Sequence, residues 1–139
     1  TSKNSIKIYE KTFIGHLTNR PNILKLCHNS CRFSPMKTAD YNLVRRDLDK
    51  VIELAPDFVY AYYNRANVAI AMNDYRSALS DYDMAIELDP KLADAYYNRG
   101  LTHIHLGNNK LGIQDLSKAG ELGLYKAYNV IKRFTERKE

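Results

Sequence analysis

Three side chains that can bind a metal stand close together near the start of the chain: Cys27, His28 and Cys31, in the stretch CHNSC. Thiolates and imidazoles are the usual ligands of zinc, but a structural zinc site needs four ligands and this stretch supplies three. On a helix Cys27 and Cys31 would share one face, where two small thiols are also suited to burial in a core. We therefore expect burial, and we predict neither a metal nor another cofactor.

The other residues that could take part in catalysis are not spaced as in a known active site. His103 and His105 are two residues apart, so on a helix they point in different directions and cannot chelate one ion together. The sequence has no phosphate-cradling glycine loop, no nucleophile-elbow glycine motif and no HExxH pair. It therefore predicts a protein that is not an enzyme.

The net charge of +5 is unevenly distributed along the chain. Residues 1–38 carry a net charge of +6, residues 39–123 a net charge of −4 and residues 124–139 a net charge of +3. The basic residues of 1–38 are evenly spaced with few aromatic residues between them, which indicates a solvated surface. Nucleic acid is not the favoured partner, although electrostatic binding of RNA or DNA through the basic ends stays an alternative.

Neither a membrane span nor a targeting signal is recognisable. No apolar run approaches the roughly 18–20 residues that a membrane span requires. The chain begins with Thr, and no charged-then-apolar signal segment follows it. We expect a fragment of a longer protein. Its compartment is unknown, with the cytoplasm slightly favoured.

The sequence repeats itself with a period of 34 residues. AYYNRA at 61–66 returns as AYYNRG at 95–100, and DYDMAIELDP at 81–90 aligns with both 47–56 and 115–124. Similarity at one period over three units is typical of stacked repeat arrays, in which each unit needs its neighbours to bury its apolar face.

Each unit contains two helical patterns. Small and apolar residues recur at helical spacing from Tyr62 and again from Ala78. The break between them is Asn-Asp at 73–74 and Gly-Asn-Asn at 107–109, both of which favour a helix end and a turn. Pro90 ends the second helix of its unit, because proline cannot continue a helix. We expect large tyrosines to pack opposite small residues at the helix crossings.

This pattern resembles the tetratricopeptide repeat of bacterial-type domains. The resemblance covers residues 59–92 and 93–126, although Leu124 replaces the expected proline. It implies an all-α fold, a right-handed α-solenoid of helix-turn-helix repeats with a C-terminal capping helix. The residues that we expect to build this architecture are Tyr62, Arg65, Ala66, Ala78, Asp81, Tyr82, Ala85, Pro90, Tyr96, Arg99, Gly100 and Asp115.

The rest of the chain fits the repeat less well. Residues 39–58 match only the second helix of a partial repeat. Residues 1–38 are a divergent basic segment, in which we expect two short helices between residues 5 and 33. Residues 127–139 have apolar residues on one side and charges on the other, which predicts the capping helix.

Arg65 and Arg99 lie 16 residues before Asp81 and Asp115. A repeated ion pair that links helices is the expected role of these residues. A ligand-gripping role for the arginines is the alternative.

The resemblance implies a groove lined by the first helix of each repeat. Asparagine offers a donor and an acceptor to an extended peptide backbone, and tyrosine adds flat apolar area with a polar tip. The alternative is that Asn64 and Asn98 bond only to their own neighbouring helices. The predicted groove residues are Tyr63, Asn64, Asn67, Tyr97, Asn98, Leu101, His105 and Lys132.

Some members of the family hold the C-terminal carboxylate of a chaperone in this groove. The matching positions here are Tyr63, Asn67, Asn98, Tyr128 and Lys132, so tyrosines stand where two lysines are expected. Without those cations most of the charge-assisted bonds to a carboxylate are lost, and a chaperone tail is not the favoured ligand.

The sequence therefore predicts a non-catalytic scaffold that binds an unidentified peptide or protein segment in the groove. The array could instead only self-associate as a homo-oligomer, because a partial repeat would leave an apolar face exposed.

Overall fold

The computed structural model describes residues 38–137, which belong to the compact unit Met36–Glu139. The expected helices in residues 5–33, and the stretch from Cys27 to Cys31, lie outside the described residues. Within the described range all regular structure is helical, and no strand is present. No helix there is long and apolar enough to cross a membrane.

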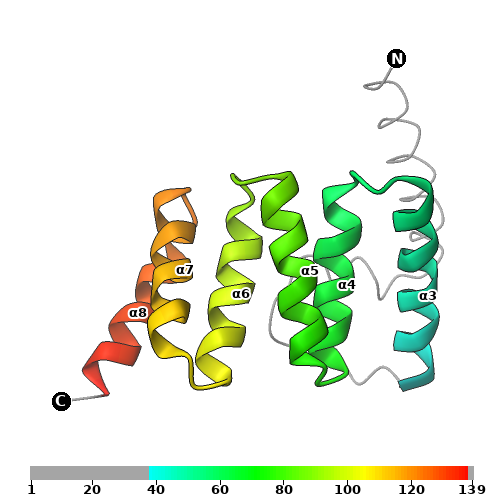
Figure 1. Cartoon of the computed structure of the whole chain (residues 1–139). Coiled ribbons are helices and arrows are strands. Elements are labelled where there is room, and N and C mark those ends of the chain that lie inside the picture. Colours follow the sequence, from blue (N-terminus) through cyan, green and yellow to red (C-terminus); the bar gives the residue numbers. More distant parts are fainter. Residues whose placement is uncertain (1–37, 138–139) are drawn as a thin grey trace. The chain divides into compact units, whose positions relative to one another are not determined.

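Six helices follow one another along the described chain and lie side by side in antiparallel order (Figure 1). Each packs on the next, and the hairpins α4–α5 and α6–α7 have the closest association. This is the expected all-α helical repeat solenoid. The helices are α3 Thr38–Leu54, α4 Val59–Ala71, α5 Tyr75–Leu88, α6 Ala93–His105, α7 Asn109–Glu121 and α8 Lys126–Glu136.

Residues with left-handed backbone conformation end three of these helices. Asn73, Gly107 and Gly123 have φ values of 60°, 84° and 101°. After α4, the backbone N–H groups of Asn73 and Asp74 donate to the carbonyls of Ile70 and Ala69, and equivalent bonds close α6 and α7. These bonds satisfy the last carbonyls of each helix and reverse the chain for the next one.

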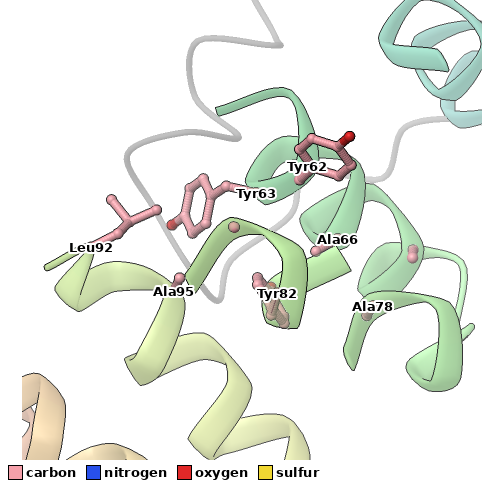
Figure 2. Packing of buried hydrophobic residues seen from close by; sticks show 9 residues of the cluster. Tyr62, Tyr63, Ala66, Ala78, Tyr82, Leu92 and Ala95 are labelled. Carbon is pink, nitrogen blue, oxygen red and sulfur yellow. The ribbon is translucent and has the colours of Figure 1, made fainter. Parts of the chain in front are cut away.

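The core of the first hairpin is built from tyrosines packed against alanines (Figure 2). Ala66, Ala78 and Ala85 are completely buried, and Tyr82 is 1% exposed. Tyr63 extends from α4 toward Leu92 and the start of α6, so the same cluster joins one hairpin to the next. Close helix crossing therefore depends on small side chains at positions that face large ones.

The second hairpin crosses even more closely, at Gly100 and Gly112. A Cβ added to Gly112 would lie 2.7 Å from the carbonyl oxygen of Gly100, and one added to Gly100 would lie 2.9 Å from that of Gly112. The backbones of α6 and α7 therefore touch, and no side chain fits between them.

Helix α8 departs from the 34-residue period. The N–H groups of Ala61, Ala95 and Ala127 donate to the carbonyls of Phe58, Leu92 and Leu124, and all three alanines are completely buried. These equivalent positions are 34 residues apart in the first step and 32 in the second. Each position of the repeat is consequently reached two residues earlier in the sequence of α8 than a constant period predicts.

Candidate functional site

Arg65 and Arg99 each bridge three helices. Nε and Nη2 of Arg65 donate to the carboxylate of Asp81 on α5 at 2.8 and 2.7 Å, and Nη1 donates to Asp49 on α3 at 2.8 Å. Arg99 repeats this arrangement with Asp115 on α7 and Asp83 on α5. Hydrogen bonds to Asp81 and Asp115 contribute most to raising the pKa of each arginine above its ordinary value. Both arginines therefore have structural partners.

Asp49 and Asp83 were not among the residues expected from the sequence. A signal for them was present, because each lies 16 residues before its arginine, just as Asp81 and Asp115 lie 16 residues after. The arginine carbons also lie over tyrosine rings, Arg65 over Tyr62 at 5.7 Å and Arg99 over Tyr96 at 5.6 Å. The guanidinium groups are thus enclosed between rings and carboxylates.

A buried network of polar side chains connects α4, α5 and α6. The hydroxyl of Tyr82 donates to Oδ1 of Asn67 at 2.6 Å. Nδ2 of Asn98 donates to the same oxygen at 3.0 Å and to the hydroxyl of Tyr63 at 3.1 Å. Asn67 and Asn98 are 9% and 8% exposed, so the network is nearly buried and solvent reaches only a small part of each residue.

These bonds fix which way each amide points. Oδ1 of Asn67 accepts two hydrogen bonds and Nδ2 of Asn98 donates two, which saturates both atoms. Nδ2 of Asn67 and Oδ1 of Asn98 have no hydrogen-bond partner within residues 38–137. Within this range the one fully buried side-chain nitrogen or oxygen without a hydrogen bond is Nδ1 of His103, so both asparagine atoms are reached by solvent. An available donor therefore lies on α4 and an available acceptor on α6, the two helices that the network joins.

Tyr97 on α6 and Lys126 on α8 contact each other. Tyr97, the neighbour of Asn98 on α6, is 9% exposed. Nζ of Lys126, in the first turn of α8, lies 4.5 Å from the centre of the Tyr97 ring. This ammonium group on α8 was not among the residues expected from the sequence, because the constant period placed Tyr128 in its position.

The other predicted groove residues are more dispersed. Asn64 and Leu101 are half-buried, and Leu101 packs against the cluster that contains Tyr97. His105 is exposed at the end of α6, with its ring 4.6 Å from that of Tyr75. Lys132 is exposed and pairs with Glu136 at 3.8 Å. The structure joins Tyr63, Asn67 and Asn98 by hydrogen bonds, whereas Tyr97 packs in the cluster with Leu116, Ala119 and Ala127.

Two sequence models of the tetratricopeptide repeat match the chain, one over residues 59–92 and one over residues 81–114. The chain carries a tetratricopeptide-repeat domain. Members of this family are generally non-catalytic interaction modules. Within the described residues, no group of three His, Cys, Asp or Glu side chains is placed to hold a metal ion.

Solved tetratricopeptide-repeat structures share the fold. YrrB, described as a TPR protein with an unusual peptide-binding site, is 26% identical with a TM-score of 0.62, and the match covers 66% of this chain and 48% of YrrB. The chain thus spans about half the length of that relative. No curated protein matches the sequence.

Two further structures are similar in fold. MamA is 24% identical with a TM-score of 0.65, over 96% of this chain and 76% of MamA. The first TPR of Spaghetti (RPAP3), solved with the HSP90 peptide SRMEEVD, is 20% identical with a TM-score of 0.67, over 84% of this chain and 93% of that chain.

Proposed function

We propose that the chain is a non-catalytic scaffold that binds an extended segment of a partner protein across α4 and α6. The observation that carries this proposal is the fixed orientation of two amides, with Nδ2 of Asn67 and Oδ1 of Asn98 left available at the surface. The peptide-binding site of the TPR protein YrrB, 26% identical, supports a ligand of this kind.

An extended peptide matches these two atoms. In an extended chain the N–H and C=O groups of one residue point to the same side, as they do between paired strands. The ligand carbonyl would accept from Nδ2 of Asn67, while the ligand N–H would donate to Oδ1 of Asn98. Because internal bonds already hold both amides in place, little side-chain entropy remains to be lost on binding.

Tyrosine packing would supply apolar contact beside the amides. Tyr63 accepts a hydrogen bond from Asn98, and Tyr97 precedes Asn98 on α6. Both rings are held by the core, so each would offer a rigid edge to the ligand. Asn64, Leu101 and His105 extend the proposed surface along α4 and α6.

The test is selection of binding peptides from a displayed library of random 12-residue sequences on the full chain. Asn67→Asp is the sharpest variant, because its carboxylate still accepts from Tyr82 and Asn98 while the outward donor becomes an acceptor. Selected peptides should bind Asn67→Asp at least tenfold more weakly in fluorescence anisotropy. The variant loses the hydrogen bond to the ligand carbonyl and sets a carboxylate oxygen against that carbonyl oxygen.

Asn42→Asp is the matched control, since it makes the same chemical change at an exposed position on α3. It should bind like the wild type, and circular dichroism should show equal helicity for all three proteins. Failure to select any peptide, or equal binding by Asn67→Asp, would contradict the proposal.

A further inference from the structure

We infer that the chain associates with a second copy of itself, such that α8 of one copy lies across an acidic end of the helix array of the next. The two surfaces belong to different parts of the domain, and neither includes Asn67 or Asn98. Exposed apolar residues, carboxylates without partners and the opposite charges of the two surfaces support this contact.

The connections α3–α4 and α5–α6 lie at the same end of the array, because successive helices are antiparallel (Figure 1). They are equivalent in sequence, since residues 53–60 read ELAPDFVY and residues 87–94 read ELDPKLAD. The first stretch carries two acids and no base, and the second carries three acids and one base. The same positions at 121–128 carry one acid and one base, so the negative charge is confined to the first two connections. We call residues 53–60 and 87–94 together the acidic end.

Most carboxylates of the acidic end lack partners. Four of them are exposed and form no ion pair or side-chain hydrogen bond within residues 38–137: Glu53, Asp57, Glu87 and Asp94. Glu53 and Glu87 lie in the last turns of α3 and α5, which hold no base. The negative end of a helix dipole disfavours an acid there. A cation from another molecule would relieve this repulsion.

Apolar side chains accompany these carboxylates. Leu54 is 74% exposed, and Tyr60 and Leu88 are exposed as well. Leu54 and Leu88 directly follow the two glutamates of the acidic end, so each connection presents a leucine beside its acids. Exposed apolar residues with charged neighbours are typical of a surface that a partner covers.

Helix α8 carries the opposite charge. Residues 125–137 include four bases and one acid. The apolar side of α8, with Ala127, packs on the array, so the bases lie on its exposed sides. Arg133 and Arg137 are exposed and form no ion pair within the part of the chain that the structure describes. They are four residues apart and therefore lie side by side on the helix.

The other charges of α8 are already engaged. Lys126 lies over the ring of Tyr97, and Lys132 pairs with Glu136 at 3.8 Å. Arg133 and Arg137 are therefore the two cations that α8 offers to a second copy.

The two surfaces also match in length. Two helix spacings of about 8–10 Å put the two connections at most about 20 Å apart. With 11 residues, α8 is about 16 Å long, and its arginine side chains extend further. Tyr125, 74% exposed at the start of α8, would cover the leucine of one connection. Arg133 and Arg137 would then pair with the carboxylates of the other.

Such a contact joins two different surfaces, so it is heterologous and further copies can add to it. It should be weak, because few charges carry it and they stay close to water. It should also weaken as salt is added, since the screening length shortens.

Sedimentation velocity of the full chain, from about 10 µM to about 1 mM protein, tests the contact. The wild type should associate at about 0.03 M NaCl, with a dissociation constant that is at least about tenfold higher at about 0.5 M NaCl. At low salt, Glu53→Lys/Glu87→Lys and Arg133→Glu/Arg137→Glu should each raise this constant at least about tenfold. Both glutamates are changed because either connection can receive the arginines, and lysine suits the last turn of a helix.

A mixture of the two charge-reversed variants provides the sharpest test. The reversed acidic end of one variant is complementary to the reversed α8 of the other, so the mixture should associate within about threefold of the wild type. Both variants keep a net positive charge, so attraction between whole proteins cannot produce this recovery. If circular dichroism shows that the α8 variant loses helicity, Arg133→Gln/Arg137→Gln replaces it and should weaken association at least about threefold.

Two further variants are matched controls, because they make the same charge changes at exposed positions outside both surfaces: Arg76→Glu/Lys110→Glu and Asp40→Lys/Asp47→Lys. Both should associate like the wild type. A monomer at every concentration, association that is equal at both salt concentrations, or controls that weaken it as much as the surface variants would overturn the inference. So would mixed helical variants that do not recover. Weakening by the acidic-end variant alone would mean that the partner cation lies outside α8, and would overturn it as well.

Discussion

Arg65 and Asp81 form a bidentate salt bridge. Nε and Nη2 of the arginine donate to the two oxygens of the carboxylate at 2.8 and 2.7 Å. The third donor, Nη1, reaches back to Asp49 on the preceding helix. Because Arg99 repeats the arrangement, α3 to α7 are connected by two Asp–Arg–Asp bridges. Each bridge joins a repeat to its neighbour as well as the two helices within a repeat.

The two carboxylates of one bridge should differ in their contribution to stability. The side chain of Asp81 is 10% exposed and that of Asp49 is 45% exposed. Asp81→Ala should lower the free energy of unfolding by about 2–3 kcal/mol, because it leaves a half-buried guanidinium without its main partner. Asp49→Ala should cost under about 1 kcal/mol, since its contact is screened by water. Urea unfolding followed by circular dichroism measures both.

The second bridge provides an internal replicate. Asp115 and Asp83 have side-chain exposures of 11% and 63%, so Asp115→Ala should again cost more than Asp83→Ala. Equal losses for the inner and outer carboxylates would show that burial does not control the strength of these contacts.

Gly112→Ala should destabilise the domain although alanine favours helices. The new Cβ would lie 2.5 Å from Cγ1 of Ile104 and 2.7 Å from the backbone oxygen of Gly100. Because a backbone atom cannot turn away, α6 and α7 must separate, at a cost of about 1–3 kcal/mol. Thermal unfolding would show the loss, and Lys110→Ala on the same helix is the control. Restored stability in Ile104→Ala/Gly112→Ala would mean that the backbone contact is unimportant.

The fold could be predicted from the sequence because the residue patterns that specify it are local and recur in each repeat. The spacing of Tyr62, Ala66, Ala78 and Tyr82 specifies two amphipathic helices, and the 34-residue period specifies that they stack. Helix ends were also predictable, since Asn73 and Gly107 adopt the left-handed conformation that these residue types favour.

The candidate site was less predictable, for two physical reasons. Whether an asparagine faces a ligand or a neighbour depends on contacts between repeats, such as Asn98 with Tyr63, that lie 35 residues apart. The position of Lys126 depends on a two-residue shift, which follows from the left-handed turn at Gly123 in place of the exit through Pro90. A constant period therefore placed Tyr128 in the position that Lys126 takes.

Asp74 should make the stability of the domain depend on pH. It caps α5, and hydrogen bonds from Ser77 hold the pKa of its carboxyl below the ordinary value. A lowered pKa in the folded state means that the unfolded chain takes up the proton first as pH falls. The contribution is therefore complete above about pH 4 and is lost below it, as pH falls through the folded value.

The variant Asp74→Asn isolates the titration, because an asparagine side chain can still cap the helix but carries no titrating proton. The stability difference between wild type and Asp74→Asn should shrink as the pH of urea unfolding is lowered from about 5 to about 2. Asp74→Ala should lose about 1 kcal/mol at neutral pH through loss of the cap. A difference between wild type and Asp74→Asn that stays constant with pH would exclude Asp74 as the titrating group.

Tyr82→Phe should weaken ligand binding without removing any atom that contacts the ligand. Tyr82 is 1% exposed, and its hydroxyl occupies one of the two acceptor positions on Oδ1 of Asn67. Without it the Asn67 amide is held only by Asn98 and can turn, so the outward donor is less well fixed. We expect a stability loss of about 0.5–1.5 kcal/mol and a roughly two- to fivefold loss of peptide affinity.

Tyr41→Phe, which removes the hydroxyl of another buried tyrosine, on α3, is the control for the loss of a hydroxyl. If Tyr82→Phe lost stability but bound the selected peptides with unchanged affinity, the orientation of Asn67 would not depend on Tyr82, and the preorganised amide pair would no longer explain binding.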